Sequence, residues 1–143
     1  SWLSGVTHGA GLFVAVGSDG TVLTSSDGVA WTAQTSGTDA WLSGVTHGAG
    51  RFVAVGSDGT VLTSWDGVSW TRQASGTGAN LGGVTYGSGL FVAVGDDGTV
   101  LTSSDGVNWT ARASETTSPL LGVTHGAGRF VAVGWEGTIL TSP

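Results

Sequence analysis

Short runs of apolar residues alternate with glycine-rich turns along the whole chain. Leu12–Val16 is one such run, LFVAV, and the same run or its RFVAV variant begins again at residues 51, 90 and 129. Apolar runs of about four to eight residues between turn signals are typical of strands that are buried on both faces. The pattern therefore predicts strands that are covered by other sheets.

Each run belongs to a unit in which we expect four short strands. In the first unit these are Leu3–His8, Leu12–Val16, Thr21–Ser25 and Trp31–Gln34. The pair Asp19-Gly20 suits the positive φ angles of a tight hairpin turn. Neighbouring strands of one unit are therefore expected to pair antiparallel.

The unit repeats every 39 residues without gaps, over 2–40, 41–79, 80–118 and 119–143. The first two copies differ at only six positions, which indicates recent duplication or deliberate design, so a designed, reconstructed or excised chain is one hypothesis. Antiparallel four-stranded units of about 40 residues are typical of β-propeller blades. A β-solenoid is the competing architecture, although its strands pair mainly with the next coil. We predict an all-β protein with one repeat domain over 1–143, a β-propeller whose last blade lacks its outer strand.

The segment SSDGVAWT at residues 25–32 recurs as SWDGVSWT and SSDGVNWT. A short acid can accept hydrogen bonds from the amides of its own turn, and glycine allows a positive φ. The tryptophan is expected to bury its ring beside the turn. A catalytic acid repeated in every blade would have no reason to exist. We therefore expect a structural role for the motif residues, which are Ser25, Asp27, Gly28, Trp31, Ser64, Asp66, Gly67, Trp70, Ser103, Asp105, Gly106 and Trp109.

The pattern Ser-x-Asp-Gly-x-x-Trp resembles the Asp-box, or BNR, repeat of β-propeller proteins such as bacterial sialidases and sortilin-type receptors. The segment GLFVAVGSDGTVLTSSDGVAWT is most similar to the propeller factors that assist photosystem II assembly. The resemblance covers essentially the whole chain and implies a propeller with the box on the outer rim, between the third and fourth strands of a blade. It does not imply one activity, because the motif occurs with many unrelated functions.

The resemblance does not extend to a sialidase active site. That site contains an arginine cluster, a tyrosine nucleophile with a glutamate partner, and an acid. This chain has four arginines and one tyrosine. Arg51 and Arg129 align with Leu12 and Leu90, which suggests surface variation. We therefore predict no catalytic residues, no cofactor and no enzymatic activity.

The composition narrows the choice of partners. Ten acids and four arginines, without lysine, give a formal net charge of −6. Nucleic acids and anionic membrane surfaces attract clustered positive charge, so neither partner is expected. No stretch approaches the roughly 20 apolar residues of a transmembrane helix. The lack of cysteine excludes disulfides but leaves the compartment open, with an extracellular or periplasmic location favoured for a natural protein.

Four aligned side chains could face the central channel of a propeller, because the first strand of a blade lines it. These are His8, His47, Tyr86 and His125, and a ring of imidazoles could bind a metal ion or an anion. We favour the other interpretation, in which each histidine forms a hydrogen bond to the neighbouring blade or simply fills the end of its strand. Tyr86 interrupts the ring and no acid lies beside the histidines, so no metal site is predicted.

Three tryptophans other than Trp31, Trp70 and Trp109 are candidate ligand contacts. Trp65 and Trp135 occupy turn positions at which other copies have serine or aspartate, and Trp41 is the third. Exposed aromatic side chains on loops commonly contact sugars or proteins, although packing against a neighbouring blade or subunit explains them equally well. Two function hypotheses follow. One is a non-enzymatic, self-assembling propeller that acts as a structural or binding scaffold for a protein or carbohydrate ligand. The other is a lectin-like carbohydrate-binding module that uses inter-blade pockets and the loop tryptophans.

The outer faces of the first and last blades raise the question of assembly. Each would expose an apolar sheet to water, so the row of blades must close or pair. Four blades could form a ring alone, or two chains could form one ring of eight. We predict the homodimer, because a ring of four is the tightest in the usual range of about 4–8 blades and two-fold symmetry is common.

Overall fold

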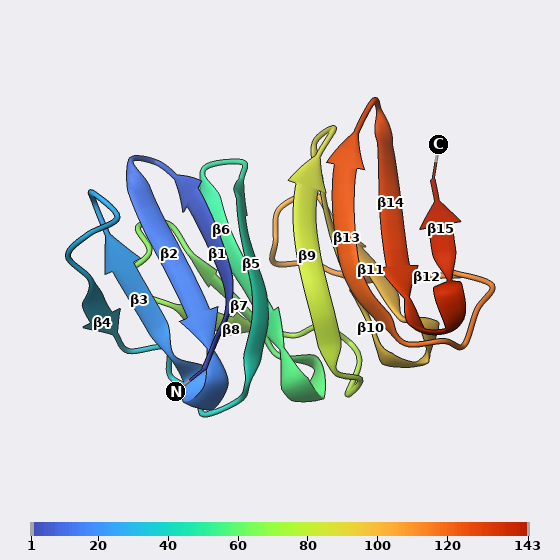
Figure 1. Cartoon of the computed structure of the whole chain (residues 1–143), viewed down its shortest axis with the longest axis horizontal. Helices are drawn as coiled ribbons and strands as arrows, with labels where there is room; N and C mark the ends of the chain where they lie inside the picture. The colour runs from blue at the N-terminus through green and yellow to red at the C-terminus, as the bar shows by residue number, and fades with distance from the viewer. Residues whose placement is uncertain (1, 143) are drawn as a thin grey trace.

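The computed structural model describes residues 2–142, in which fifteen strands form four antiparallel sheets (Figure 1). We refer to the sheets as blades 1 to 4. Blade 1 contains β1 Leu3–Gly9, β2 Leu12–Gly17, β3 Val22–Ser25 and β4 Thr32–Gln34. Blade 2 contains β5 Leu42–Gly48, β6 Arg51–Gly56, β7 Val61–Ser64 and β8 Thr71–Gln73. Blade 3 contains β9 Leu81–Gly87, β10 Leu90–Gly95, β11 Val100–Ser103 and β12 Thr110–Arg112, and blade 4 contains β13 Leu120–Gly126, β14 Arg129–Gly134 and β15 Ile139–Thr141.

Strands follow one another in sequence order within every blade, which confirms the predicted β-propeller blade and the shorter fourth sheet. The strand bounds differ slightly from the sequence prediction. The third strand begins at Val22 because the amide of Thr21 closes the preceding turn by donating to the Ser18 carbonyl, at 3.1 Å. The fourth begins at Thr32 because Thr32 is the first residue that pairs with the third strand, opposite Thr24.

The turn between the second and third strands is the tight hairpin expected from Asp19-Gly20. Asp19 has φ 58° and ψ 32°, and Gly20 has φ 67°. Two successive residues with positive φ make a type I′ turn, whose twist matches that of the flanking strands. The other blades repeat this geometry at Asp58-Gly59, Asp97-Gly98 and Glu136-Gly137.

The blades pack on one another through their first strands, with β5 between β1 and β9, and β9 between β5 and β13. A row of glycines makes this close approach possible. A Cβ atom on Gly5 would lie 3.2 Å from the Cα atom of Gly44, and one on Gly44 would lie 3.4 Å from the Cα atom of Gly83. A larger residue at these places would push neighbouring blades apart.

Each pair of neighbouring blades encloses its own hydrophobic core. Between blades 1 and 2, Val14 and Val16 pack against Leu42 and Phe52, all completely buried. The cores between blades 2 and 3 and between blades 3 and 4 are built from the equivalent residues. Stability therefore comes mainly from contacts between successive repeats, as in other repeat proteins.

The four blades form an open row, with blade 1 and blade 4 at opposite ends (Figure 1). The prediction that the apolar second strand is buried on both faces is confirmed in blades 2 and 3. The prediction is wrong for blade 4, where Val133 is 46% exposed. The reason is that no blade follows blade 4 within residues 2–142. Over this same range, the structure contains no helix of the length and hydrophobicity needed to cross a membrane.

Candidate functional site

The Asp-box motif forms a closed set of hydrogen bonds on the outer rim of each of the first three blades. In blade 1, Oδ1 of Asp27 accepts hydrogen bonds from the amides of Val29, at 2.8 Å, and Ala30, at 3.0 Å. It also accepts one from the hydroxyl of Ser25, at 3.0 Å. The Ser25 oxygen in turn accepts from the amide of Gly28, at 2.8 Å.

The same bonds occur in blades 2 and 3. Asp66 accepts from the amides of Val68 and Ser69 at 2.9 and 3.0 Å. Nε1 of Trp70 donates to the carbonyl of Gly67 at 2.9 Å, which ties the indole to its turn. In each box, the aspartate carboxylate therefore accepts hydrogen bonds from backbone amides of its own turn. The box has the geometry of a turn.

These hydrogen bonds stabilise the ionised form of each box acid. The amides of Val29 and Ala30 lower the pKa of Asp27 below its ordinary value. In blade 3 the backbone amides of Asn108 and Val107, together with the Asn108 side chain, hold the pKa of Asp105 well below its usual range. An acid with a lowered pKa is a poor proton donor at neutral pH.

The tryptophans of the box are less uniformly buried than predicted. Trp70 and Trp109 pack against the cores between blades, but Trp31 is 40% exposed. The prediction that Trp31 is buried is therefore wrong. Its ring contacts Phe13 of its own blade, but no blade precedes blade 1 among the described residues to cover its other face.

The four side chains predicted near the channel lie at equivalent places at the end of the first strands. His47 rests on Gly9, where a Cβ atom would overlap its ring, and Tyr86 and His125 rest in the same way on Gly48 and Gly87. Each ring also packs on the phenylalanine of its own blade, with centroid distances of 4.5 to 4.7 Å. Three of the four side chains thus fill the space between two blades.

The polar atoms of these rings show little sign of a common ligand. Nε2 of His125 lies 2.9 Å from the Ser88 hydroxyl. Burial, with a smaller effect from nearby His8, lowers the pKa of His47. Within residues 2–142, no three histidine, aspartate or glutamate side chains are grouped closely enough to hold a metal ion.

The loop tryptophans do not gather into one site. Trp65 is 66% exposed and stacks on the guanidinium of Arg51, which lies 4.0 Å from the ring centroid. Nε1 of Trp41 donates to the Ser4 hydroxyl at 2.8 Å, and its ring meets Trp2 edge to face. Trp135 starts the exposed turn Trp135–Gly137 in blade 4. Trp41 and Trp65 belong to blade 2 and Trp135 belongs to blade 4, so these side chains offer separate contact points.

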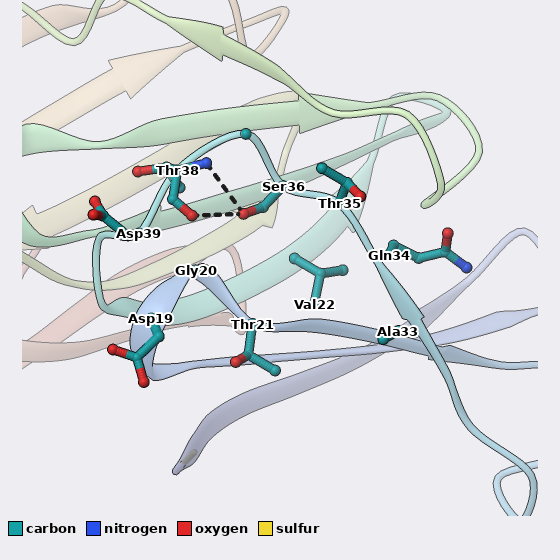
Figure 2. Close-up of a pocket in the computed structure, with 11 residues that line it drawn as sticks. Asp19, Gly20, Thr21, Val22, Ala33, Gln34, Thr35, Ser36, Thr38 and Asp39 are labelled. Carbon is teal, nitrogen blue, oxygen red and sulfur yellow. Dashed lines mark hydrogen bonds between the residues drawn. The ribbon is translucent and has the colours of Figure 1, made fainter.

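Three shallow pockets on the rim repeat from blade to blade. The pocket of blade 1 has a volume of about 740 Å³ and lies between the hairpin turn at Asp19 and the connection that follows β4. Figure 2 shows Asp19 and Asp39 at one end of it and Gln34 at the other, with Ser36 hydrogen-bonded to Thr38. Related pockets of about 410 and 760 Å³ occur in blades 2 and 3. Their lining combines polar groups with small apolar side chains such as Val22 and Ala33, and Trp41, Trp65 and Trp135 are not among the lining residues.

One contact between blades gives a role to a residue that the sequence suggested only as surface variation. Nη1 of Arg51 in blade 2 donates to the backbone carbonyl of Asp105 in the box of blade 3, at 2.8 Å. The sequence feature that could have indicated this contact is the alternation of Leu12, Arg51, Leu90 and Arg129. The contact could be predicted from it only by knowing which box faces which strand.

Several solved structures share this fold. YCF48 from Cyanidioschyzon merolae matches with a TM-score of 0.76 at 21% identity, over 99% of this chain and 52% of that one. A structure of YCF48 bound to D1 peptide matches with a TM-score of 0.78 at 20% identity, over 99% and 49% of the two chains. The computationally designed Ika4 protein matches with a TM-score of 0.77 at 14% identity, over 99% and 91%.

These similarities establish the β-propeller fold and no more, because the identities are low. The chain spans about half the length of the two YCF48 chains that it matches. No protein-family model matches the chain, and no curated protein is similar enough to match it.

Proposed function

We propose that this chain is a non-enzymatic, self-assembling β-propeller scaffold whose single repeat domain pairs with a second copy to complete an eight-bladed ring. The observation that carries the proposal is the pair of exposed end faces. On the blade-1 end face, Leu3 and Val6 are 55% and 63% exposed. On the blade-4 end face, Val133 and Ile139 are 46% and 68% exposed. Between neighbouring blades within the chain, a face equivalent to the blade-1 end face packs against a face equivalent to the blade-4 end face.

The two end faces are complementary because each repeats one side of an internal interface. Gly126 has no atom near the place of its missing Cβ, whereas Gly9, Gly48 and Gly87 each lie under a ring from the next blade. His8 of a second copy would fill that place, as His47 does on Gly9. Arg129 would reach the Asp27 box of the second copy, as Arg51 reaches the Asp105 box within the chain.

Two copies fit the usual size of such rings. A head-to-tail interface gives a closed ring when the rotation between copies closes. Two copies supply eight blades, which is within the common range of about 4–8, whereas three copies would supply twelve. The Leu/Arg alternation continues unbroken around a ring of eight and around a ring of four, so it does not distinguish them.

The absence of an enzymatic role is part of the proposal. The repeated carboxylates of the Asp-boxes accept hydrogen bonds from their own turns, which favours a structural role for them. Of the similar structures, one is of YCF48 bound to a D1 peptide and one is of a designed protein. A scaffold that presents a surface to a protein ligand is consistent with both.

The mass in solution tests the assembly. Light scattering on the eluting protein should give 28.2 kDa, twice the chain mass of 14.1 kDa. A folded species of 14.1 kDa at all concentrations would contradict the proposal. Panels of chromogenic glycosides, sialosides included, should show no turnover. Turnover that scales with protein concentration would contradict the proposal that the protein is not an enzyme.

A carbohydrate-binding module is the second candidate function. The three equivalent rim pockets favour it, because their hydroxyl, amide and carboxylate groups suit a hydroxyl-rich ligand. The tryptophans that sugars commonly stack on lie outside these pockets, so any stacking would have to occur at Trp65 or Trp135 on its own. A glycan array is the direct test. Binding that is lost in Gln34→Ala and Gln73→Ala would support this function, and an array without hits would dismiss it.

A further inference from the structure

Blade 4 differs from the other blades by a groove at its outer edge. The groove has a volume of about 570 Å³ and lies between blades 3 and 4. Strands β10 and β11 form one wall, and strands β14 and β15 form the other. Its apolar lining includes Leu90, Val92, Val100, Phe130 and Leu140.

In blades 2 and 3, the equivalent space is occupied by the Asp-box of the same blade. The glycine of the blade 2 box, Gly67, lies against Leu12, Val14 and Phe52. The residues at these three places in the groove are Leu90, Val92 and Phe130. The groove is therefore lined by the surface on which a box rests elsewhere in the molecule.

The aromatic contacts point to the same occupant. In the first three blades the phenylalanine of the second strand packs on the box tryptophan with one geometry: the centroids of Phe13 and Trp31, of Phe52 and Trp70, and of Phe91 and Trp109 are each 6.4 Å apart. Among residues 2–142, Phe130 has a ring contact with His125 but none with a tryptophan.

Burial shows that the groove leaves apolar side chains partly exposed. Leu62 and Leu101, on the third strands of blades 2 and 3, are each 1% exposed. Leu140, at the same place on β15, is only half-buried, and so is Phe130. A ligand that covers these two side chains would remove apolar surface from water, which favours binding.

The edge of β15 can also accept a strand. In blade 3, β11 pairs with β10 on one side and with β12 on the other, with Leu101 opposite Ala111. In blade 4, β15 pairs with β14, and within the described part of the chain no strand lies on its other side. Peptides commonly bind to such edges by adding a strand, with side-chain pockets giving specificity.

We propose that this groove binds a peptide that contains the sequence Asp-Gly-x-x-Trp-Thr. Its first residues take up the box turn, its tryptophan packs on Phe130 and Leu140, and the residues that follow the tryptophan add as a fourth strand beside β15. The box of blade 2 is the better template, because it rests on Leu12, which Leu90 matches. The box of blade 3 is instead held by a hydrogen bond from Arg51.

The probe is a fluorescein-labelled peptide with the sequence of residues 66–76, DGVSWTRQASG, added to the 143-residue chain. Its anisotropy should rise and saturate. A peptide with alanine in place of tryptophan should bind at least tenfold more weakly, and a peptide of scrambled sequence should not saturate. No rise, or equal binding of the three peptides, would overturn the proposal.

Two neighbouring positions on β15 give a matched pair of protein variants. Leu140 lines the groove, whereas Ile139 is 68% exposed on the blade-4 end face. Leu140→Gln should weaken peptide binding at least tenfold, and Ile139→Gln should leave it within twofold. Equal effects of the two variants would overturn the site. If Leu140→Gln does not fold, Leu140→Ala serves in its place with a smaller loss in the same direction.

This design also separates the groove from the proposed dimer. The groove lies between two blades of one chain, so peptide binding should persist in a monomer. Ile139→Gln is expected to weaken dimer formation, with no loss of peptide binding. Amide exchange provides an independent readout, since strand addition should slow the exchange of β15 amides and leave those of β7 unchanged. Faster or unchanged β15 exchange at saturating peptide would contradict strand addition.

Discussion

Strands β1 and β5 contain the same seven residues, LSGVTHG, yet they have different surroundings. Leu3 is 55% exposed, whereas Leu42 is completely buried. Val6 is 63% exposed, whereas Val45 is 8% exposed. The strand geometry is the same, so the difference comes from the neighbour: β5 has a blade on each side, whereas β1 has a blade on one side. Local sequence determines the strand, and the number of neighbouring blades determines its burial.

The other end of the chain shows the same contrast. Ile139 in blade 4 is 68% exposed, and its counterpart Val61 in blade 2 is completely buried. Repeat proteins gain much of their stability from interfaces between successive units. A chain with two complementary uncovered interfaces is therefore expected to associate with a copy of itself.

The largest expected effect comes from placing a charge on one end face. Val6→Glu should reduce the solution mass from 28.2 to 14.1 kDa, because the second copy would bury an unpaired carboxylate. Val68→Glu is the control, since Val68 is also exposed, at 46%, but belongs to an internal blade. Light scattering provides both masses. A Val6→Glu protein that keeps the mass of 28.2 kDa would show that this face is not the interface.

A smaller effect is expected when the box tryptophans of blades 1 and 2 are replaced and the losses in free energy of unfolding are compared. Trp70→Ala should lower the free energy of unfolding by about 3 kcal/mol at every protein concentration, because Trp70 packs in a core within the chain. Trp31→Ala should instead produce a loss that grows with protein concentration, since Trp31 would be covered by the second copy. Denaturant titrations at two concentrations provide the comparison. Equal, concentration-independent losses would contradict it.

The smallest effect concerns the pH dependence of the box turns. The pKa of Asp105 is lowered in the folded state, so its hydrogen bonds stabilise the fold above the ordinary pKa of a carboxyl group, near 4. That contribution is lost as the pH falls below about 4 and approaches the lowered folded-state pKa. Asp105→Ala should therefore reduce the melting temperature more at pH 7 than at pH 2, with Ser104→Ala as the control. A reduction of equal size at both pH values would contradict a role for the ionised carboxylate.

The features that depend on a few neighbouring residues could be predicted from the sequence. The hairpin turn at Asp19-Gly20 and the order of strands within a blade are confirmed. The burial of Trp31 was predicted wrongly, because the local motif says nothing about whether another blade covers it. The hydrogen bond from Arg51 to Asp105 joins residues 54 positions apart. It depends on which box faces which strand, and that follows only from the packing of the blades.

Amide exchange of the two identical strands tests the central claim most directly. The segments Leu3–Gly9 and Leu42–Gly48 are both preceded by tryptophan and followed by alanine and glycine, so their intrinsic exchange rates are equal. If two copies form the proposed eight-bladed ring, residue-resolved NMR should find similar protection in β1 and β5 at high protein concentration. On dilution, β1 should lose protection before β5 does. Protection of β1 that is far below that of β5 and independent of concentration would contradict assembly through the end faces.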